Sequence, residues 1–478
     1  MIFMTPVLFI LIPLLSGLIA FILKSEKTVK WFAVFSSVFT LAVVLHVIYY
    51  NLHTSFSATW LPALGSSFSI SIDGMGKLLV MLTGIAFPAV FISTVKNSYK
   101  NPSSFYALML LTQAGLMGVF MATDALVFYF FWELALIPVY FLASIWGGPK
   151  RIAVTFKFFI YTFIGSLLML VGILYLYVAS PEHSFSIQSL INNHLTGKEQ
   201  NIVIWLFFLA FAFKMPVFPL HTWQPDTYEQ SPTAVTIILS AVMVKMGVFA
   251  VVRWLAPLFP QAMQTFGLVI IIFSIVGMIY ASLIAIRQDD IKRLIAYSSI
   301  AHIGLMSAAI FSQNEFGLQG VMIQMFNHGI IVIGLWIVAD VIEQQLGTRK
   351  ISELGGLAQK APALAILLMV LGLANIGLPL TNGFVGEFFM FNGLFNYNIW
   401  VAVVALISII LAAVYTLNMV QKIFYGNTVA VTQQATDANN FVITVLIVLV
   451  LLVIFFGVYP QPLINLTKDT VNNIFIKH

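Results

Sequence analysis

The chain has 478 residues, of which 60% are hydrophobic and only 8% are charged. This composition excludes a soluble enzyme and fits a protein with many membrane spans. The formal charge of +5 is no sign of nucleic-acid binding, because the basic residues lie mostly between apolar runs; the lack of cysteine excludes iron–sulfur clusters, thiolate metal sites and disulfides.

Apolar runs near the length that crosses a bilayer as a helix recur along the whole chain. They number about 14, with approximate centres at Ile12, Leu41, Gly84, Gly115, Leu134, Leu168, Ala212, Ala241, Ile272, His302, Ile331, Ile376, Ile410 and Val450. The first run lacks a basic leader and a small-residue cleavage site, so we expect a retained span. The sequence therefore predicts an all-α polytopic membrane protein with about 14 transmembrane helices.

Two of these runs contain residues that break helices. In the seventh run, Lys214 stands at mid-span and Pro216 and Pro219 follow it; in the twelfth, Pro379 lies between two glycines. Proline removes a backbone donor and clashes with the preceding turn, and broken backbone at membrane depth is tolerated only inside protein or beside a wet cavity. Spans 7 and 12 are therefore predicted to be broken helices. They lie five spans apart, in opposite orientation, which points to a transport site, although two Pro-Leu dipeptides can also match by chance.

The loops between spans fall into two sets that differ in lysine and arginine. One set holds most of the basic residues, from Lys24 and Lys100 to Arg349, whereas the other holds only Lys198, Arg253, Lys468 and Lys477. Basic loops stay on the cytoplasmic side. The bias predicts that both termini lie outside, which is the periplasm if the chain resides in a bacterial inner membrane.

Four charged residues lie deep inside apolar runs: Glu133, Lys214, Lys245 and Glu387. An isolated charge there costs about 3 kcal/mol on insertion scales. Burial favours the neutral form of such groups and pairing favours the charged form, so they can hold or release a proton as the geometry changes. A snorkelling lysine, or a static Glu133–Lys214 pair that fixes packing, is the simpler interpretation of any one site. Four sites on four spans favour a proton or ion pathway.

Histidines and one further lysine extend this set. His221 follows the first break, and His302 and His328 lie within spans 10 and 11. Histidine titrates near neutral pH and can pass protons, although a lone buried histidine is more often a hydrogen-bonded core residue. Lys157 lies nearer a span end, where snorkelling and function are equally good interpretations.

Several segments resemble one family. Phe131-Trp132-Glu133, Lys214-Met215-Pro216, the run Asp289 to Ser299 and the run Gly383 to Phe388 are similar to the antiporter-like proton-pumping subunits of respiratory complex I. The resemblance implies three N-terminal helices in residues 1–103, two inverted five-helix repeats in residues 104–255 and 256–426, and a fourteenth helix with a tail in residues 427–478. A glutamate at position 387, in place of a lysine, further resembles one branch of that family.

The resemblance also implies roles. The buried titratable residues would pass protons, with Glu133 and Lys214 as a modulating pair, Lys245 as central relay, His302 and His328 as carriers and Glu387 as terminal exchanging site. It implies that this chain binds no cofactor, and that NADH, FMN, iron–sulfur clusters and quinone belong to partner subunits. The chain would then be a subunit of a proton-translocating NADH:quinone oxidoreductase.

Two other functions fit the same features. One is a subunit of an Mrp-type sodium/proton antiporter or of a membrane-bound hydrogenase, for which one residue, Glu387, is the main counter-argument. The other is a stand-alone carrier of a small solute, which predicts a polar substrate pocket where this sequence shows titratable residues spaced along successive spans.

Overall fold

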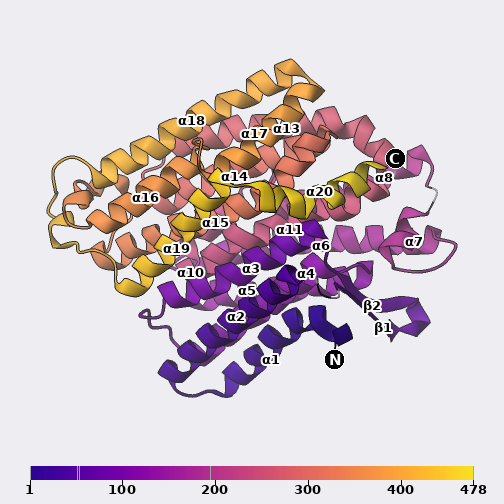
Figure 1. The fold of residues 1–478 in the computed structure, drawn as a ribbon, viewed down its shortest axis with the longest axis horizontal. Coiled ribbons are helices and arrows are strands. Elements are labelled where there is room, and N and C mark those ends of the chain that lie inside the picture. Colours follow the sequence, from indigo (N-terminus) through magenta and orange to yellow (C-terminus); the bar gives the residue numbers. More distant parts are fainter. Residues whose placement is uncertain (1, 51, 53, 194, 477–478) are drawn as a thin grey trace.

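Long apolar helices run side by side along the molecule (Figure 1). The computed structural model describes residues 2–50, 52, 54–193 and 195–476, and within these 12 helices are long and apolar enough to cross a membrane. Six precede the first break: α1 (Leu8–Ile22, after the 3-10 turn Ile2–Val7), α2 (Glu26–Tyr49), α3 (Gly74–Ser93), α4 (Pro102–Met121), α5 (Ala125–Trp146) and α6 (Arg151–Ala179). The other six are the helical segment Thr233–Leu258, α13 (Pro260–Ile286), α14 (Ile291–Phe311), α15 (Glu315–Leu346), α18 (Ile399–Phe424) and α19 (Asn440–Val458). The chain is a multi-pass membrane protein, as the sequence predicts.

The first broken helix consists of α8 (Gly197–Lys214) and α9 (Trp223–Gln230). The helix α8 begins at a capping box, in which Thr196 and Glu199 bond each other's backbone N–H groups. It ends at Lys214, two residues before Pro216, and the Phe218–Pro219 peptide bond in the connection is cis. The indole of Trp223 donates to the carbonyl oxygen of Phe213 at 2.9 Å. This bond satisfies one of the carbonyls that the break leaves unpaired, which makes the break tolerable inside the protein.

The second broken helix consists of α16 (Pro362–Asn375) and α17 (Asn382–Tyr397). The side-chain amide of Asn327 in α15 donates to the carbonyl oxygen of Asn382 at 2.7 Å, and the amide of Asn382 donates back to Asn327 Oδ1 at 3.3 Å. The break is therefore pinned to α15. With these two broken spans added to the apolar helices, the protein has about 14 spans, and both breaks lie where the prolines predict them.

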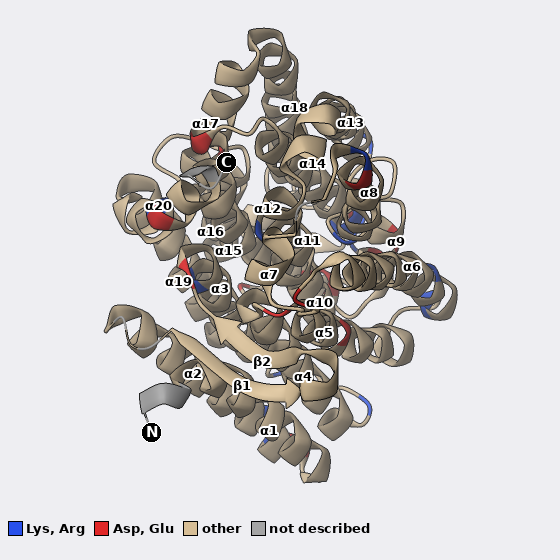
Figure 2. Ribbon diagram, turned by 90° about the vertical axis from the view of Figure 1, so that its right-hand side faces the viewer, with Lys and Arg blue, Asp and Glu red and all other residues tan. Residues whose placement is uncertain are grey.

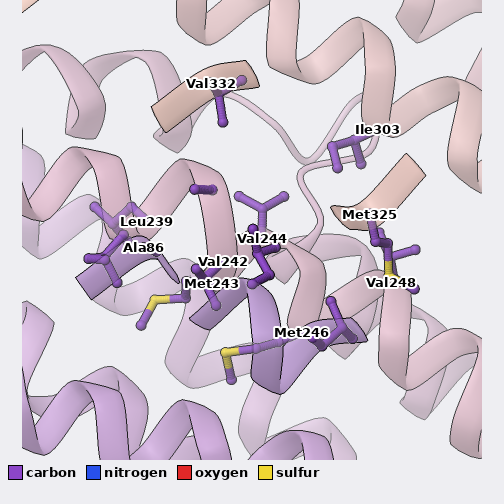
Figure 3. Packing of buried hydrophobic residues seen from close by; sticks show 14 of the residues in the cluster. Ala86, Leu239, Val242, Met243, Val244, Met246, Val248, Ile303, Met325 and Val332 are labelled. Atoms are coloured by element: carbon purple, nitrogen blue, oxygen red, sulfur yellow. The ribbon is translucent and has the colours of Figure 1, made fainter. Parts of the chain in front are cut away.

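The segment Thr233–Leu258 is buried over most of its length and irregular in pitch. It consists of α10 (Thr233–Ile238), a π-helical turn (Leu239–Met243), α11 (Val244–Ala250), a second π-helical turn (Val251–Leu255) and α12 (Ala256–Leu258). Figure 3 shows Val244, Met246 and Val248 of this segment packed beside Ile303 and Met325 from α14 and α15. Lys245 thus stands in a densely packed apolar core, between two turns whose wider pitch disturbs the helical hydrogen-bond ladder.

A β-hairpin closes one end of the molecule, and the sequence analysis did not predict it. Strands β1 (Ser55–Leu61) and β2 (Ser66–Ser71) pair antiparallel, with Ser55 opposite Ser71. Figure 2 looks onto this hairpin end, which also carries the short helix α7 (Ile187–Ile191). Both described ends of the chain lie toward this side in Figure 1, as two termini on one face of a membrane require.

The final helix α20 (Gln461–Ile476) packs across α15 and α3 at the same end. Its Thr470 hydroxyl accepts from the Gly74 N–H at 3.0 Å. Beside it Arg253 and Asp73 form an ion pair at 2.5 Å. Desolvation would raise the pKa of Asp73, but the Arg253 charge and the Gly76 N–H outweigh it and hold the pKa below its usual range.

The opposite end gathers the basic loops. The Trp146 indole donates to the carbonyl oxygen of Lys100 at 2.5 Å, and the Lys150 N–H donates to Gln230 at 3.1 Å. Arg349 forms ion pairs with Glu229, Asp290 and Glu343 from three different parts of the chain. The loops that the sequence analysis placed on one side therefore meet in space, and we call this face the basic end.

Candidate functional site

Lys245 and His328 are in direct contact in the centre of the protein. The Lys245 ammonium, fully buried, donates to the carbonyl oxygen of Ser240 at 2.7 Å and contacts His328 Nδ1 at 2.9 Å. Ser240 belongs to the first π-helical turn, so the irregular pitch of this span places a carbonyl beside the lysine. A charged lysine can only donate, so when Lys245 carries its proton His328 accepts at Nδ1 and holds its own hydrogen on Nε2.

His302 and Glu387 extend this contact. The rings of His328 and His302 lie 5.0 Å apart between centroids, and His302 Nδ1 lies 3.2 Å from Glu387 Oε1. The four side chains come from α11, α15, α14 and α17 and are all buried. We call them the relay, in the spatial order Lys245, His328, His302, Glu387.

The relay joins groups that can each hold or give up a proton. The Nε2 atoms of His328 and His302 have no hydrogen-bond partner among the described residues. A ring nitrogen without a fixed partner is free to take or release a proton when its ring turns. The arrangement can therefore pass a proton stepwise between a lysine in an unbroken span and a glutamate beside a helix break.

Glu387 lies where the second break approaches a small cavity. Gly377, in the left-handed region at φ +76°, places its backbone directly against the Glu387 carboxylate. A cavity of about 20 Å³ is bounded by Glu387, His302, Ser408 and Tyr415. That is enough for about one water molecule.

Lys214 and Glu133 do not form the direct pair that we expected. No carboxylate in the described part of the chain lies within 4 Å of the Lys214 ammonium, which also has no hydrogen-bond partner there. Instead, Lys214 Nζ stands 5.7 Å from the ring centre of Trp132 and 5.9 Å from that of Phe158. Two ring faces stabilise a cation without bonding it to one geometry, while Glu133 acts on Lys214 only through its charge at longer range.

The two remaining candidates lie outside the relay. Lys157 forms an ion pair with Asp226 at 2.9 Å and donates to the carbonyl oxygen of Thr222 at 2.9 Å. These contacts join α6 to the start of α9. His221 lies against the rings of Phe218 and Tyr280, with centroids 5.7 and 5.5 Å away. Neither contacts a relay residue by any described hydrogen bond or ion pair.

Sequence reasoning missed the neutral polar residues around Glu387. Ser298 accepts from the Tyr415 hydroxyl at 3.0 Å and from the Asn375 amide at 3.1 Å, and Asn375 also donates to Thr416 at 3.3 Å. An asparagine deep in an apolar run is a detectable signal, because its amide needs partners. A tyrosine or threonine in such a run is too common to single out.

The described residues hold no group of three or more histidine, aspartate or glutamate side chains that could bind a metal ion.

The comparisons with known proteins agree with one another. Residues 122–412 match the family described as NADH:quinone oxidoreductase/Mrp antiporter, transmembrane. NADH-quinone oxidoreductase subunit M of Rickettsia prowazekii is 36% identical over 465 residues, which cover 95% of this chain and 94% of the relative. A chain of respiratory complex I from Thermus thermophilus with bound NADH is 28% identical, with a TM-score of 0.91 over 98% of this chain and 99% of that one. A chain of the Mrp complex from a Dietzia species shares the fold at 19% identity, with a TM-score of 0.88 over 98% and 97%.

Proposed function

Because this chain belongs to the family of membrane subunits found in NADH:quinone oxidoreductases and Mrp antiporters, we propose that it is a proton-translocating membrane subunit of an NADH:quinone oxidoreductase. The relative from Rickettsia prowazekii, which aligns with nearly the whole chain, is named as subunit M of that enzyme. The glutamate at position 387 supports the same branch of the family.

The observation that carries the proposal is the relay. Lys245, His328, His302 and Glu387 come from four different spans, yet each stands beside the next. Isolated buried charges are too costly to persist without a role in packing or transport. One ion pair is enough to fix the packing of two helices. A row of adjacent titratable groups is what stepwise proton transfer requires.

The energy for translocation comes from partner subunits. With no cysteine in the chain and no nucleotide motif, NADH oxidation and its flavin and iron–sulfur chemistry belong to partner chains, as does the quinone site. Moving one charge against 100 mV requires about 2.3 kcal/mol. A shift in the charge environment of Lys214 is a sufficient input, because aromatic rings hold this lysine without fixing it to a counter-ion. In this proposal Glu133 and Lys214 modulate the relay and do not carry the proton through it.

The chain resides in the bacterial plasma membrane with its basic end in the cytoplasm and its hairpin end and termini in the periplasm. The inverted repeats span residues 104–255 and 256–426 and each contributes one broken helix. The first supplies Lys214 and Lys245, and the second supplies His302, His328 and Glu387.

The experiment that tests this proposal is purification of the chain with an affinity tag from mildly solubilised membranes. We expect subunits that oxidise NADH to co-purify with the tagged chain, together with neighbouring antiporter-like membrane subunits. The purified complex should reduce quinone with NADH. Isolation of the tagged chain alone, or with a set of subunits that exchange sodium for protons and oxidise nothing, would refute it in favour of a carrier or an Mrp-type antiporter.

A further inference from the structure

Tyr415 in α18 lines two separate cavities. The larger, of about 310 Å³, lies at the basic end between the loops that carry Asp289 and Ser352, near Lys422. The smaller is the cavity of about 20 Å³ against Glu387 and His302. Among the described residues, Tyr415 is the one that belongs to both linings.

The tyrosine side chain is held in place by its hydroxyl group. It is 1% exposed, and its hydroxyl donates to Ser298 in α14 at 3.0 Å. Ser298 in turn is fixed by the Asn375 amide at the end of α16. The helices α13, α14, α17 and α18 lie together in the upper part of Figure 1, and α18 contacts the other three.

The two cavities differ in what they can hold. The larger is bounded in part by charged and amide side chains, Gln288, Asp289, Asn418 and Lys422, and in part by apolar ones. A polar space of that size is filled by water. The smaller holds about one water molecule and places it against the Glu387 carboxylate. Tyr415 therefore lies in the wall of both the larger polar space and the cavity against the last member of the relay.

We propose that Tyr415 is a movable partition, and that its displacement connects Glu387 to the basic end of the molecule. This rests on the proposed function, because it gives the exchanging glutamate a second route in addition to His302. When the ring swings aside, a proton passes from hydronium in the larger cavity to the Glu387 carboxylate. An O–H bond forms on Glu387, one breaks on the hydronium, and a water molecule remains; no electron moves.

The partition must stay closed except while Glu387 exchanges a proton with the larger cavity. If Glu387 faced the basic end and the relay at the same time, protons would cross without work being done. The hydrogen bond from Tyr415 to Ser298 supplies the closed position, and Ser298 sits on α14 only four residues before His302. Movement of α14 therefore changes the partition and the relay together.

The test uses the intact complex in lipid vesicles with an imposed pH gradient and no NADH. The rate at which the gradient decays is compared for Tyr415→Ala, Tyr415→Phe, and the matched control Tyr425→Ala, a half-exposed tyrosine just beyond the same helix that lines neither cavity. Tyr415→Ala should speed the decay by about threefold or more, because a gate held open conducts continuously. Tyr415→Phe keeps the ring but loses the hydrogen bond to Ser298, so its decay should be faster than that of the unmodified complex and slower than that of Tyr415→Ala. Tyr425→Ala should stay within about twofold of the unmodified complex.

A second substitution locates the leak. Adding Glu387→Gln to Tyr415→Ala should return the decay to its original rate, since the leak runs through that carboxylate. Unchanged decay in an assembled Tyr415→Ala complex, equal leaks in the Ala and Phe variants, or a leak that survives Glu387→Gln would each overturn the partition. If Tyr415→Ala prevents assembly, Tyr415→Leu provides the same comparison with a smaller cavity.

NADH-driven pumping is recorded on the same vesicles. A Glu387→Gln complex that still pumps at full rate contradicts the proposed function, whereas the decay without NADH tests the partition alone. The two failures can therefore be told apart.

Discussion

His302 connects Glu387 to the rest of the relay. Its Nδ1 atom lies 3.2 Å from the Glu387 carboxylate, and its ring centroid lies 5.0 Å from that of His328. Its Nε2 atom has no partner among the described residues, so the ring is not locked by hydrogen bonds on both nitrogens. Among single residues, His302 is therefore the sharpest test of the proposed relay.

His302→Gln should lower the rate of proton translocation by about tenfold or more, because glutamine can hydrogen-bond but cannot take up a proton. The complex should still assemble, since glutamine fills similar space. The matched control is His46→Gln, which changes a histidine on the exposed face of α2. Pumping in vesicles is measured against the content of assembled complex; equal rates for the two variants would remove His302 from the pathway.

Glu133→Gln tests the role of the carboxylate near Lys214. Because the lysine is bracketed by Trp132 and Phe158 and not bonded to Glu133, we expect assembly near the normal level and pumping reduced severalfold, on the order of 1 kcal/mol of lost electrostatic interaction. The charge swap Glu133→Lys with Lys214→Glu should not restore pumping. Poor assembly in Glu133→Gln that the swap rescues would show a static ion pair instead.

The sequence alone identified the titratable side chains but not their order in space. A charge or histidine in an apolar run is costly, so Lys245, His302, His328 and Glu387 are visible without a structure. Their contacts depend on how α11, α14, α15 and α17 pack, and in space His302 follows His328 although it precedes it in the chain. The aromatic setting of Lys214 depends likewise on Phe158, which is 56 positions away and unremarkable in sequence.

Among the helices and their breaks, the second break positions Glu387, because a glycine there lets the backbone approach its carboxylate. Gly377 adopts φ +76°, a conformation that favours glycine, and a side chain there would meet the Glu387 carboxylate. The breaks themselves could be predicted, since proline enforces them. The π-helical turns around Lys245 and the β-hairpin were missed, because the first depend on tertiary packing and the second lies in a short serine-rich loop.

Gly377→Ala should therefore impair both folding and transport. The strained backbone costs about 1–2 kcal/mol, which lowers the temperature at which the complex falls apart, and the displaced Glu387 should reduce pumping. Gly426→Ala is the matched control, because Gly426 has φ +84° but nothing within 4 Å of the added methyl group. The thermal loss should be similar in both variants and the pumping loss confined to Gly377→Ala; equal pumping in the two would contradict the placement of Glu387 by this glycine.

Considered as a whole, the molecule has ion pairs between distant parts of the chain at both of its ends. Arg349 binds Glu229, Asp290 and Glu343 at the basic end, whereas Arg253 binds Asp73 at the hairpin end. The alternation of basic and non-basic loops can be recognised in the sequence, because successive loops lie on opposite sides of the membrane. The long-range ion pairs at each end were not, because their partners come from distant loops.

The orientation is tested with reporter fusions. Fusions after Lys100 and after Lys350, both at the basic end, should read as cytoplasmic. A fusion in the hairpin loop after Leu64, between β1 and β2, should read as periplasmic. An external reading after either lysine would refute the orientation.

The central claim is that protons cross this chain through Glu387, and the most direct measurement is the rate of NADH-driven proton translocation in vesicles that contain a Glu387→Gln complex. The control is Glu353→Gln, which changes an exposed glutamate at the basic end that binds Lys350. We expect that both complexes assemble, that Glu353→Gln pumps normally, and that Glu387→Gln pumps about tenfold more slowly or worse. Normal pumping by an assembled Glu387→Gln complex would contradict the central claim.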